Sequence, residues 1–151
     1  MPPPDLPTTA KDMFCYGVYT ASHAINRAYG PHLKALGLTY PQYITLTLLW
    51  ERAPQKINEL ARQMGMETST LTPLVKRLET MGHVTRTRGD QDKREVFVNL
   101  TQKGNAVQAQ APAITSCMIA NTSLSHHELD QLQSLLIKLR DGLHSQPLAA
   151  R

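Results

Sequence analysis

Two cysteines are the most reactive side chains of this 151-residue chain. Cys15 lies near the beginning and Cys117 in the last third, and they form no Cys-x-x-Cys pair. A free thiol has a pKa near ~8.5, so a few per cent is thiolate at neutral pH, and the thiolate is the form that attacks a peroxide oxygen. Taken alone, Cys15 fits a small buried hydrophobic residue better than a reactive site. Whether these thiols are reactive therefore depends on the elements that position them.

The histidines predict no metal site. His126 and His127 are adjacent, so on a helix their side chains point about 100° apart and cannot hold one metal together. The other four, His23, His32, His83 and His144, show no ligand spacing. We therefore expect surface histidines, no metal and no other cofactor.

Composition limits the class of protein. The chain is 41% hydrophobic, with a net charge of +4 and a pI near 9.2, which suits one compact domain with a polyanionic partner. It has no apolar run long enough to span a membrane. The proline-rich start lacks the features of a signal peptide, so residues 1–11 are predicted to be a disordered tail and the protein to be cytoplasmic. In that reducing compartment the cysteines are expected to be free thiols.

The segment from Ile57 to Leu100 predicts a winged helix-turn-helix. In the first helix the apolar positions follow a 3.6-residue period and Gly65 ends it; they are Ile57, Leu60, Ala61 and Met64. A second helix repeats the pattern after the cap-competent run Thr68 to Thr70 and ends at Gly82. Pro73 indicates that this helix begins no earlier than about Ser69. Its outer hydroxyls, on Ser69, Thr70 and Thr72, are typical of a helix that reads a major groove.

A basic hairpin follows the second helix. Val84 to Arg88 and Glu95 to Leu100 are the expected strands, with the turn at Gly89 to Arg94. Four cations are then expected on one exposed ribbon, which can reach phosphates or enter a minor groove; they are Arg86, Arg88, Lys93 and Arg94. The alternative is a solvated hairpin with ordinary surface charge. This alternative is weaker because the hairpin directly follows a helix-turn-helix.

The outer segments predict helices for pairing. The first is expected to end at Gly30 and Pro31, and the next runs from about Pro41 to Arg52. Thr101 caps a long helix with a kink at Pro112, and Ser125 with Glu128 forms a capping box before a leucine stripe. The stripe consists of Leu129, Leu132, Leu136, Leu139 and Leu143. Such helices can pack on their own core, but a partner helix is favoured because helix-turn-helix proteins gain specificity from two half-sites about 34 Å apart.

The order of these elements resembles the MarR family of dimeric transcriptional regulators. The resemblance covers about Phe14 to Leu143 and rests on the helix Ser69 to Glu79 and on the wing segment Asp92 to Arg94. Phe14 to Tyr16, Tyr29 and the run Leu38 to Tyr43 narrow it to the organic hydroperoxide sensor branch, OhrR. It implies a mostly α fold with a small β-hairpin, formed by a single domain at 12–151. Within it, the winged helix-turn-helix spans about 41–101, and the dimerisation helices span about 12–36 and 102–146.

The same resemblance implies a redox mechanism. Cys15 is the sensing thiol, supported by the hydroxyls of Tyr29 and Tyr40, since hydrogen bonds to a thiolate stabilise it. A helix N-terminus adds to the effect if Cys15 lies in the first turn. Cys117 is the resolving cysteine, which joins the oxidised Cys15 of the other subunit in a disulfide. The protein is thus expected to be a homodimeric repressor that releases operator DNA when an organic hydroperoxide oxidises it.

For DNA, the resemblance assigns roles by position. Ser69, Thr70 and Thr72 meet bases and phosphates, while Lys76 and Arg77 meet the backbone or a guanine edge. Arg94 enters the minor groove, Asp92 orients Arg94, and Arg86 belongs to the same basic wing. The chain is therefore not expected to be an enzyme. A MarR-type regulator gated by a small aromatic ligand is the first alternative; a thiol peroxidase is a weaker one, because the chain lacks the alternating pattern of a thioredoxin-like sheet.

Overall fold

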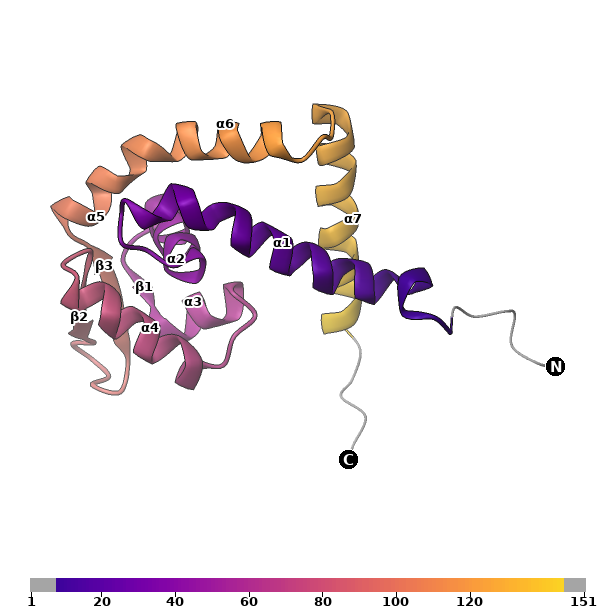
Figure 1. The fold of residues 1–151 in the computed structure, drawn as a ribbon. Coiled ribbons are helices and arrows are strands. Elements are labelled where there is room, and N and C mark those ends of the chain that lie inside the picture. Colours follow the sequence, from indigo (N-terminus) through magenta and orange to yellow (C-terminus); the bar gives the residue numbers. More distant parts are fainter. Residues whose placement is uncertain (1–7, 146–151) are drawn as a thin grey trace. The chain divides into compact units, whose positions relative to one another are not determined.

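A computed structural model describes residues 8–145 and shows two compact units, which divide between Ile114 and Thr115. Helices predominate in both, and a small sheet lies in the first (Figure 1). The expected disordered tail falls largely on residues 1–7, outside the described residues. The part that is described carries one turn of 3-10 helix, Ala10–Asp12.

The first long helix, α1 (Phe14–Lys34), continues past the predicted stop. Gly30 and Pro31 lie inside it, so the prediction that it ends there is wrong. An interior proline costs ~3 kcal/mol, and burial of the Leu33 side chain, which is 1% exposed, offsets this by about 1.5–3 kcal/mol. The chain turns instead at Gly37, whose φ of 66° is left-handed and lets Leu38 N donate to Leu33 O at 3.2 Å.

The second helix, α2 (Tyr40–Glu51), matches the predicted boundaries. Thr39 and Gln42 form a capping box, with Thr39 N donating to Gln42 Oε1 at 2.9 Å. The helix buries Leu46 and Leu49. It contacts α1, α4 (Thr68–Thr80) and β3 (Val96–Leu100). It is therefore the central helix of the first unit.

The predicted helix-turn-helix is confirmed as α3 (Ile57–Gln63) and α4 (Thr68–Thr80). Gly65, with φ of 64°, makes the turn between them. Leu60 of α3 and Leu71, Val75 and Leu78 of α4 are fully buried, as the 3.6-residue period requires. The pattern of apolar residues thus fixes which face of α4 is left for solvent.

The predicted hairpin is confirmed as β2 (Val84–Arg88) and β3 (Val96–Leu100), paired antiparallel with Arg86 opposite Val98. A third strand, β1 (Gln55–Lys56), pairs with β3 on its other side, so the strand order is β1-β3-β2. β1 was not predicted, because a two-residue strand is too short to show an alternating pattern. This strand fixes the N-terminal end of α3 to the sheet.

The helix predicted after Thr101 is interrupted. Thr101 caps α5 (Gln102–Ala106) as expected, accepting from Gly104 N at 3.1 Å. A 3-10 turn, Val107–Gln110, then separates it from α6 (Ala111–Asn121). The irregularity therefore precedes the expected kink at Pro112, because this proline cannot donate to the carbonyl of Gln108, four residues earlier.

The second unit contains most of α6 and all of α7 (His126–His144). The predicted capping box is confirmed: Glu128 N donates to Ser125 Oγ at 3.1 Å and Ser125 N donates to Glu128 Oε2 at 2.7 Å. No residue of α7 is buried. Each leucine of its stripe is exposed or half-buried.

Candidate functional site

The outer face of α4 carries the polar residues predicted for it. Ser69, Thr70, Lys76 and Arg77 are exposed, opposite the buried apolar face. Thr72 is half-buried, and its hydroxyl donates to Thr68 O at 2.8 Å, which leaves its oxygen lone pairs as acceptors. The exposed face of α4 can therefore both donate and accept hydrogen bonds along one side of the helix.

The start of α4 differs from the prediction. The N-cap is Glu67, without a side-chain cap bond, and Thr68 is already helical. Pro73 therefore lies inside the helix, where its missing N–H leaves the carbonyl of Ser69 without the usual partner four residues later. The hydroxyls of Ser69 and Thr70 are consequently not used in capping.

At the tip of the hairpin, Asp92 holds Arg94. Arg94 donates from its backbone N and its Nε to Asp92 Oδ1, at 3.0 and 3.1 Å, and from Nη2 to Oδ2 at 3.2 Å. These hydrogen bonds lower the pKa of the Asp92 carboxyl. The Arg94 side chain is nonetheless 91% exposed. The predicted orienting role of Asp92 is thus seen in the geometry, with a charged group presented to solvent.

Arg86 is not on the exposed ribbon, which corrects the prediction for it. Its backbone N donates to Glu79 Oε2 at 3.1 Å, while Nε and Nη2 both donate to Glu79 Oε1 at 3.2 Å. The side chain is 27% exposed. Its guanidinium is therefore engaged by α4, because β2 packs against that helix; Arg88, Lys93 and Arg94 remain exposed.

Lys56 is a cation at the base of the wing that sequence analysis missed. Its Nζ lies 2.6 Å from Glu95 Oε1 and 5.9 Å from the centre of the Phe97 ring. The hydrogen bond to Glu95 raises the pKa of Lys56. Lys56, Thr68 and Arg94 line one hollow between the wing and the start of α4. The only sequence signal was a lysine just before a helix, since β1 itself was not visible.

Cys15 lies in the first turn of α1, two residues after the N-cap Met13, and is exposed. Tyr29 lies 14 positions later on the same helix, which at 1.5 Å per residue places it about 21 Å along the axis. The structure therefore does not bring the thiol and this hydroxyl together within one chain. The predicted role of Tyr29 and Tyr40 stays a prediction, and it requires a second chain.

Tyr29 and Tyr40 themselves are adjacent. Their rings stack with centroids 4.3 Å apart and planes 19° apart. Burial raises the pKa of both, and Tyr29 adds to the effect on Tyr40. Both phenols therefore keep their protons at neutral pH and can donate hydrogen bonds.

Cys117 lies on α6, in the second unit, and is an exposed free thiol. Each unit also has an apolar helix face left open. On α1 the exposed apolar side chains include Phe14, Tyr16, Val18 and Tyr19, and on α7 they include Leu132, Leu135, Leu136 and Leu143. Faces of this kind are typical of helices that pack against a partner.

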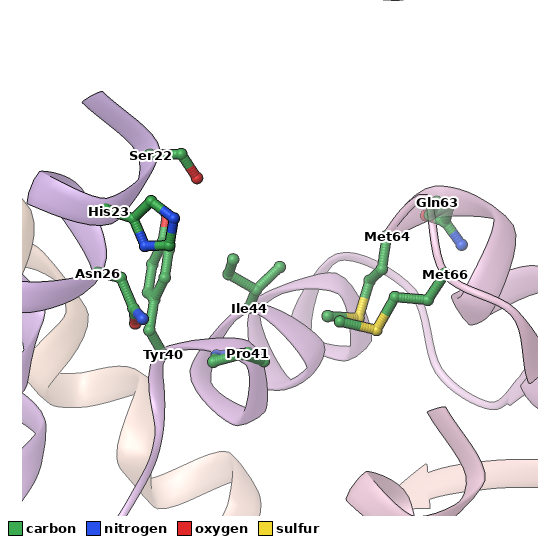
Figure 2. Close-up of a pocket in the computed structure, with 9 residues that line it drawn as sticks. All are labelled: Ser22, His23, Asn26, Tyr40, Pro41, Ile44, Gln63, Met64 and Met66. Carbon is green, nitrogen blue, oxygen red and sulfur yellow. The ribbon is translucent and has the colours of Figure 1, made fainter. Parts of the chain in front are cut away.

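One pocket of the first unit lies where α1, α2 and the helix-turn-helix meet. It has a volume of about 390 Å³. His23 and Asn26 of α1 line one side, and the thioethers of Met64 and Met66 line the other (Figure 2). The α1 end is polar, and the opposite end combines the two thioethers with the amide of Gln63.

Within residues 8–145, no cluster of His, Cys, Asp and Glu side chains could hold a metal ion. None of the helices described is long and apolar enough to cross a membrane.

Comparison with known proteins gives a consistent group of relatives. The profile of the transcriptional regulator SarA/Rot matches residues 27–110. HTH-type transcriptional regulator TtmR of Methylorubrum extorquens (strain PA1) is 37% identical over 94% of this chain and 73% of the relative. The organic hydroperoxide resistance transcriptional regulator of Bacillus subtilis (strain 168) is 34% identical over 90% of this chain and 92% of its own.

Solved structures agree with the fold. Reduced AbfR bound to DNA, a protein of Staphylococcus epidermidis, matches with a TM-score of 0.73 and 34% identity, over 87% of this chain and 90% of AbfR. Disulfide-formed AbfR matches with a TM-score of 0.58 over 87% of both chains. The predicted fold class, mostly helical with a small winged sheet, is confirmed.

Proposed function

The chain belongs to the SarA/Rot family of winged-helix transcriptional regulators, and from this membership we propose that it is a dimeric repressor that senses organic hydroperoxides through Cys15. Oxidised Cys15 forms a disulfide with Cys117 of the other subunit, and operator DNA is released. One observation carries the proposal: an exposed thiol in the first turn of α1, in a chain 34% identical to a regulator named for organic hydroperoxide resistance.

The DNA-binding part rests on α4 and the wing. The exposed face of α4 supplies hydroxyls for base edges and phosphates, and Lys76 and Arg77 supply charge. Arg94, held by Asp92 and 91% exposed, suits the concentrated negative potential of a minor groove. AbfR, which shares 34% identity, is described bound to DNA.

The dimer rests on the open faces of α1 and α7. Exposed rings and leucines on both helices are costly in water, and a second copy of the chain covers them symmetrically. Two copies also place two α4 helices in successive major grooves, about 34 Å apart. The redox signal can then act on the spacing of the two helices.

The chemistry needs two steps. The Cys15 thiolate attacks the distal oxygen of the hydroperoxide, the O–O bond breaks, and the alkoxide takes a proton to leave as an alcohol, which gives a sulfenic acid. The Cys117 thiolate of the other subunit then attacks the sulfenic sulfur. A disulfide forms and hydroxide leaves to become water. The peroxide is reduced by two electrons, and the dithiol is oxidised by two.

The tyrosines act across the dimer in this proposal. Tyr29 lies about 21 Å along α1 from the thiol of its own chain, and Tyr40 follows the end of that helix, at the start of α2. Antiparallel approach of two α1 helices would bring the stacked pair of one chain to Cys15 of the other. Protonated phenols there donate to the thiolate and stabilise it.

The decisive experiment measures DNA affinity and covalent state together. Reduced protein is titrated against a cognate duplex by fluorescence anisotropy, before and after cumene hydroperoxide, and the same samples are run on a non-reducing gel. Loss of binding with a covalent dimer that dithiothreitol reverses is the expected result. Cys15→Ser should bind DNA and form no covalent dimer when the peroxide is added.

The matched variant Cys117→Ser separates the one-cysteine and two-cysteine forms. It should still react at Cys15, form no covalent dimer, and pass more easily to the sulfinic acid, because no thiol resolves the sulfenic acid. Full, reversible release by Cys117→Ser without an added small thiol would contradict the disulfide step and leave the single-cysteine sensor. A peroxide response equal to wild type in Cys15→Ser would end the proposal.

A ligand-gated regulator is the second candidate, and the pocket of about 390 Å³ is the observation that favours it. Loss of DNA binding on addition of a phenolic compound to protein without either cysteine would select it. We propose no enzymatic role: the peroxide is consumed once per sensing thiol, and multiple turnovers in the presence of dithiothreitol would point to a thiol peroxidase instead.

A further inference from the structure

Two methionines lie at the turn of the helix-turn-helix and face the same pocket. Met64 and Met66 point their thioethers toward its interior, across from His23 and Asn26 of α1 (Figure 2). We propose that they form a second oxidation site, at which organic hydroperoxides convert the thioethers to sulfoxides and weaken DNA binding. The proposal rests on the DNA-binding part of the proposed function and is independent of both cysteines.

Met64 joins the helix-turn-helix to the centre of the first unit. It is the C-cap residue of α3, and its Sδ accepts a hydrogen bond from the Thr45 hydroxyl of α2 at 3.1 Å. Thr45 is fully buried. An oxygen added to this sulfur must therefore be placed against a close-packed part of α2.

Met66 belongs to the turn that sets the direction of α4. Its backbone N donates to Ala61 O at 2.9 Å, directly after Gly65 with its left-handed φ of 64°. This is the arrangement in which the residue after the glycine packs back on its own helix. The recognition helix begins two residues later, at Thr68, so a change in the packing of Met66 acts on α4 directly.

The pocket suits the oxidant. Its volume of about 390 Å³ lies within the range of small-ligand sites, roughly 300–1,000 Å³. Pro41 and Ile44 give an apolar wall beside the methionines, and His23 and Asn26 give polar groups opposite. A hydroperoxide with a small alkyl or aryl group matches this division. Both sulfur-bearing side chains are half-buried, so they are reached through the pocket.

The reaction is balanced without another reagent. A sulfur lone pair attacks the distal peroxide oxygen, an S–O bond forms, and the O–O bond breaks. The alkoxide takes up the proton of the hydroperoxide and leaves as an alcohol. The thioether is oxidised by two electrons to the sulfoxide, and the peroxide is reduced by two.

The sulfoxide changes an apolar, flexible side chain into a polar one. At Met64 and Met66 this polarity arises where α2, α3 and the start of α4 pack together. Moving the sulfoxide into water is the favourable response, and it displaces the turn before α4. We expect DNA affinity to fall about ten-fold, equivalent to about 1.4 kcal/mol.

The test uses full-length protein in which Cys15→Ser and Cys117→Ser remove both thiols. It is treated with cumene hydroperoxide, and sulfoxides are mapped by peptide mass spectrometry while DNA affinity is followed by anisotropy. Sulfoxide at Met64 or Met66, with about ten-fold weaker binding that sulfoxide reductases reverse, is the expected result. Failure of the thiol mechanism leaves this result unchanged, because no thiol is present.

Matched variants assign the effect. The double variant Met64→Leu, Met66→Leu nearly conserves side-chain volume. The Thr45 hydroxyl can still donate to Pro41 O at 2.9 Å. The DNA affinity of this variant should not fall on treatment with the peroxide. Met13→Leu is the control, since Met13 is 40% exposed and lies outside the helix-turn-helix; it should give no protection. Circular dichroism shows that each variant is folded.

Two outcomes would overturn the proposal. One is oxidation at Met13 with Met64 and Met66 left as thioethers. The other is complete sulfoxidation of Met64 and Met66 with unchanged DNA affinity. If the variant without thiols fails to bind the duplex even before the peroxide is added, the DNA-binding part of the proposed function is contradicted instead.

Discussion

Glu79 of α4 accepts three hydrogen bonds from Arg86 of β2, one from the backbone N and two from the guanidinium. The recognition helix and the wing are therefore joined by a carboxylate on one element and a guanidinium on the other. Thr101 and Lys103 extend the connection, because they donate to the carbonyls of Gly82 and Met81 at the end of α4. A DNA-binding surface made of two elements needs such a connection to hold α4 and Arg94 at one spacing.

Replacing Glu79→Gln should lower both stability and DNA affinity. The guanidinium and the backbone N–H of Arg86 lose a charged acceptor, at a cost of about 1 kcal/mol in the free energy of unfolding, because the pair is only half-buried. Urea unfolding measures the first effect, and anisotropy with a cognate duplex measures the second.

Glu51→Gln is the matched control, since Glu51 is exposed at the end of α2 and carries the same charge. A double-mutant cycle with Arg86→Gln isolates the pair. Strictly additive effects of the two substitutions would show that Glu79 and Arg86 do not act together.

Arg94→Ala should weaken operator binding without affecting the fold. Its side chain is 91% exposed, so unfolding should be unchanged, while loss of a groove contact costs about 1–3 kcal/mol, roughly 5- to 150-fold in affinity. The slope of affinity against salt should fall by about one. Titrations at several salt concentrations measure both quantities.

Arg140→Ala removes the same charge from α7 and controls for net charge. Asp92→Asn keeps Arg94 but loosens its orientation, so an intermediate loss is expected. Unchanged affinity of Arg94→Ala at physiological salt would exclude the wing from DNA binding.

The sequence predicted those elements that depend on local patterns. Leu71, Val75 and Leu78 repeat at helical spacing, and Gly65 and Gly82 mark the ends of helices because each has a left-handed φ. The capping box of Ser125 with Glu128 was equally local. These features place the helix-turn-helix and its exposed face without any knowledge of tertiary contacts.

What sequence reasoning missed depends on contacts between distant segments. Pro31 stays helical because Leu33 is anchored in the core, and Arg86 turns from solvent because α4 presents Glu79 to it. β1 exists only as a partner of β3. The support of Cys15 by Tyr29 was taken from a resemblance, and only the length of α1 shows that it requires a second chain.

Acid should destabilise the protein through His83. This side chain is 2% exposed, and neither ring nitrogen has a hydrogen-bond partner within residues 8–145. Burial, with a smaller effect of Lys103, lowers the pKa of His83 below 6.5. Below pH ~6.5 the unfolded chain therefore binds a proton that the folded chain does not, and the free energy of unfolding falls by up to about 1.4 kcal/mol per pH unit until the folded pKa is reached.

His83→Leu should remove this contribution. Urea unfolding of both proteins from about pH 7.5 to 5.5 should show a steeper loss in the wild type across the titration range of histidine. His126→Gln changes an exposed histidine and serves as the control. Parallel stability curves for wild type and His83→Leu would contradict the sign worked out from the buried imidazole.

The tyrosines of one chain should supply the hydroxyls to Cys15 of the other chain. Hybrid dimers are made from two differently tagged chains, one of which carries Cys15→Ser. If the other keeps Cys15 but has Tyr29→Phe and Tyr40→Phe, its thiol still meets the intact tyrosines of its partner, and sulfenic acid should form at the wild-type rate. In the converse hybrid, all three substitutions lie on one chain, and the remaining Cys15 meets only phenylalanines. Its reaction with cumene hydroperoxide should be slower, because no donor stabilises the thiolate. Stopped-flow rates of the two hybrids measure the difference, and slow reaction of the first hybrid alone would mean that the hydroxyls act within one chain, against the separation of about 21 Å along α1.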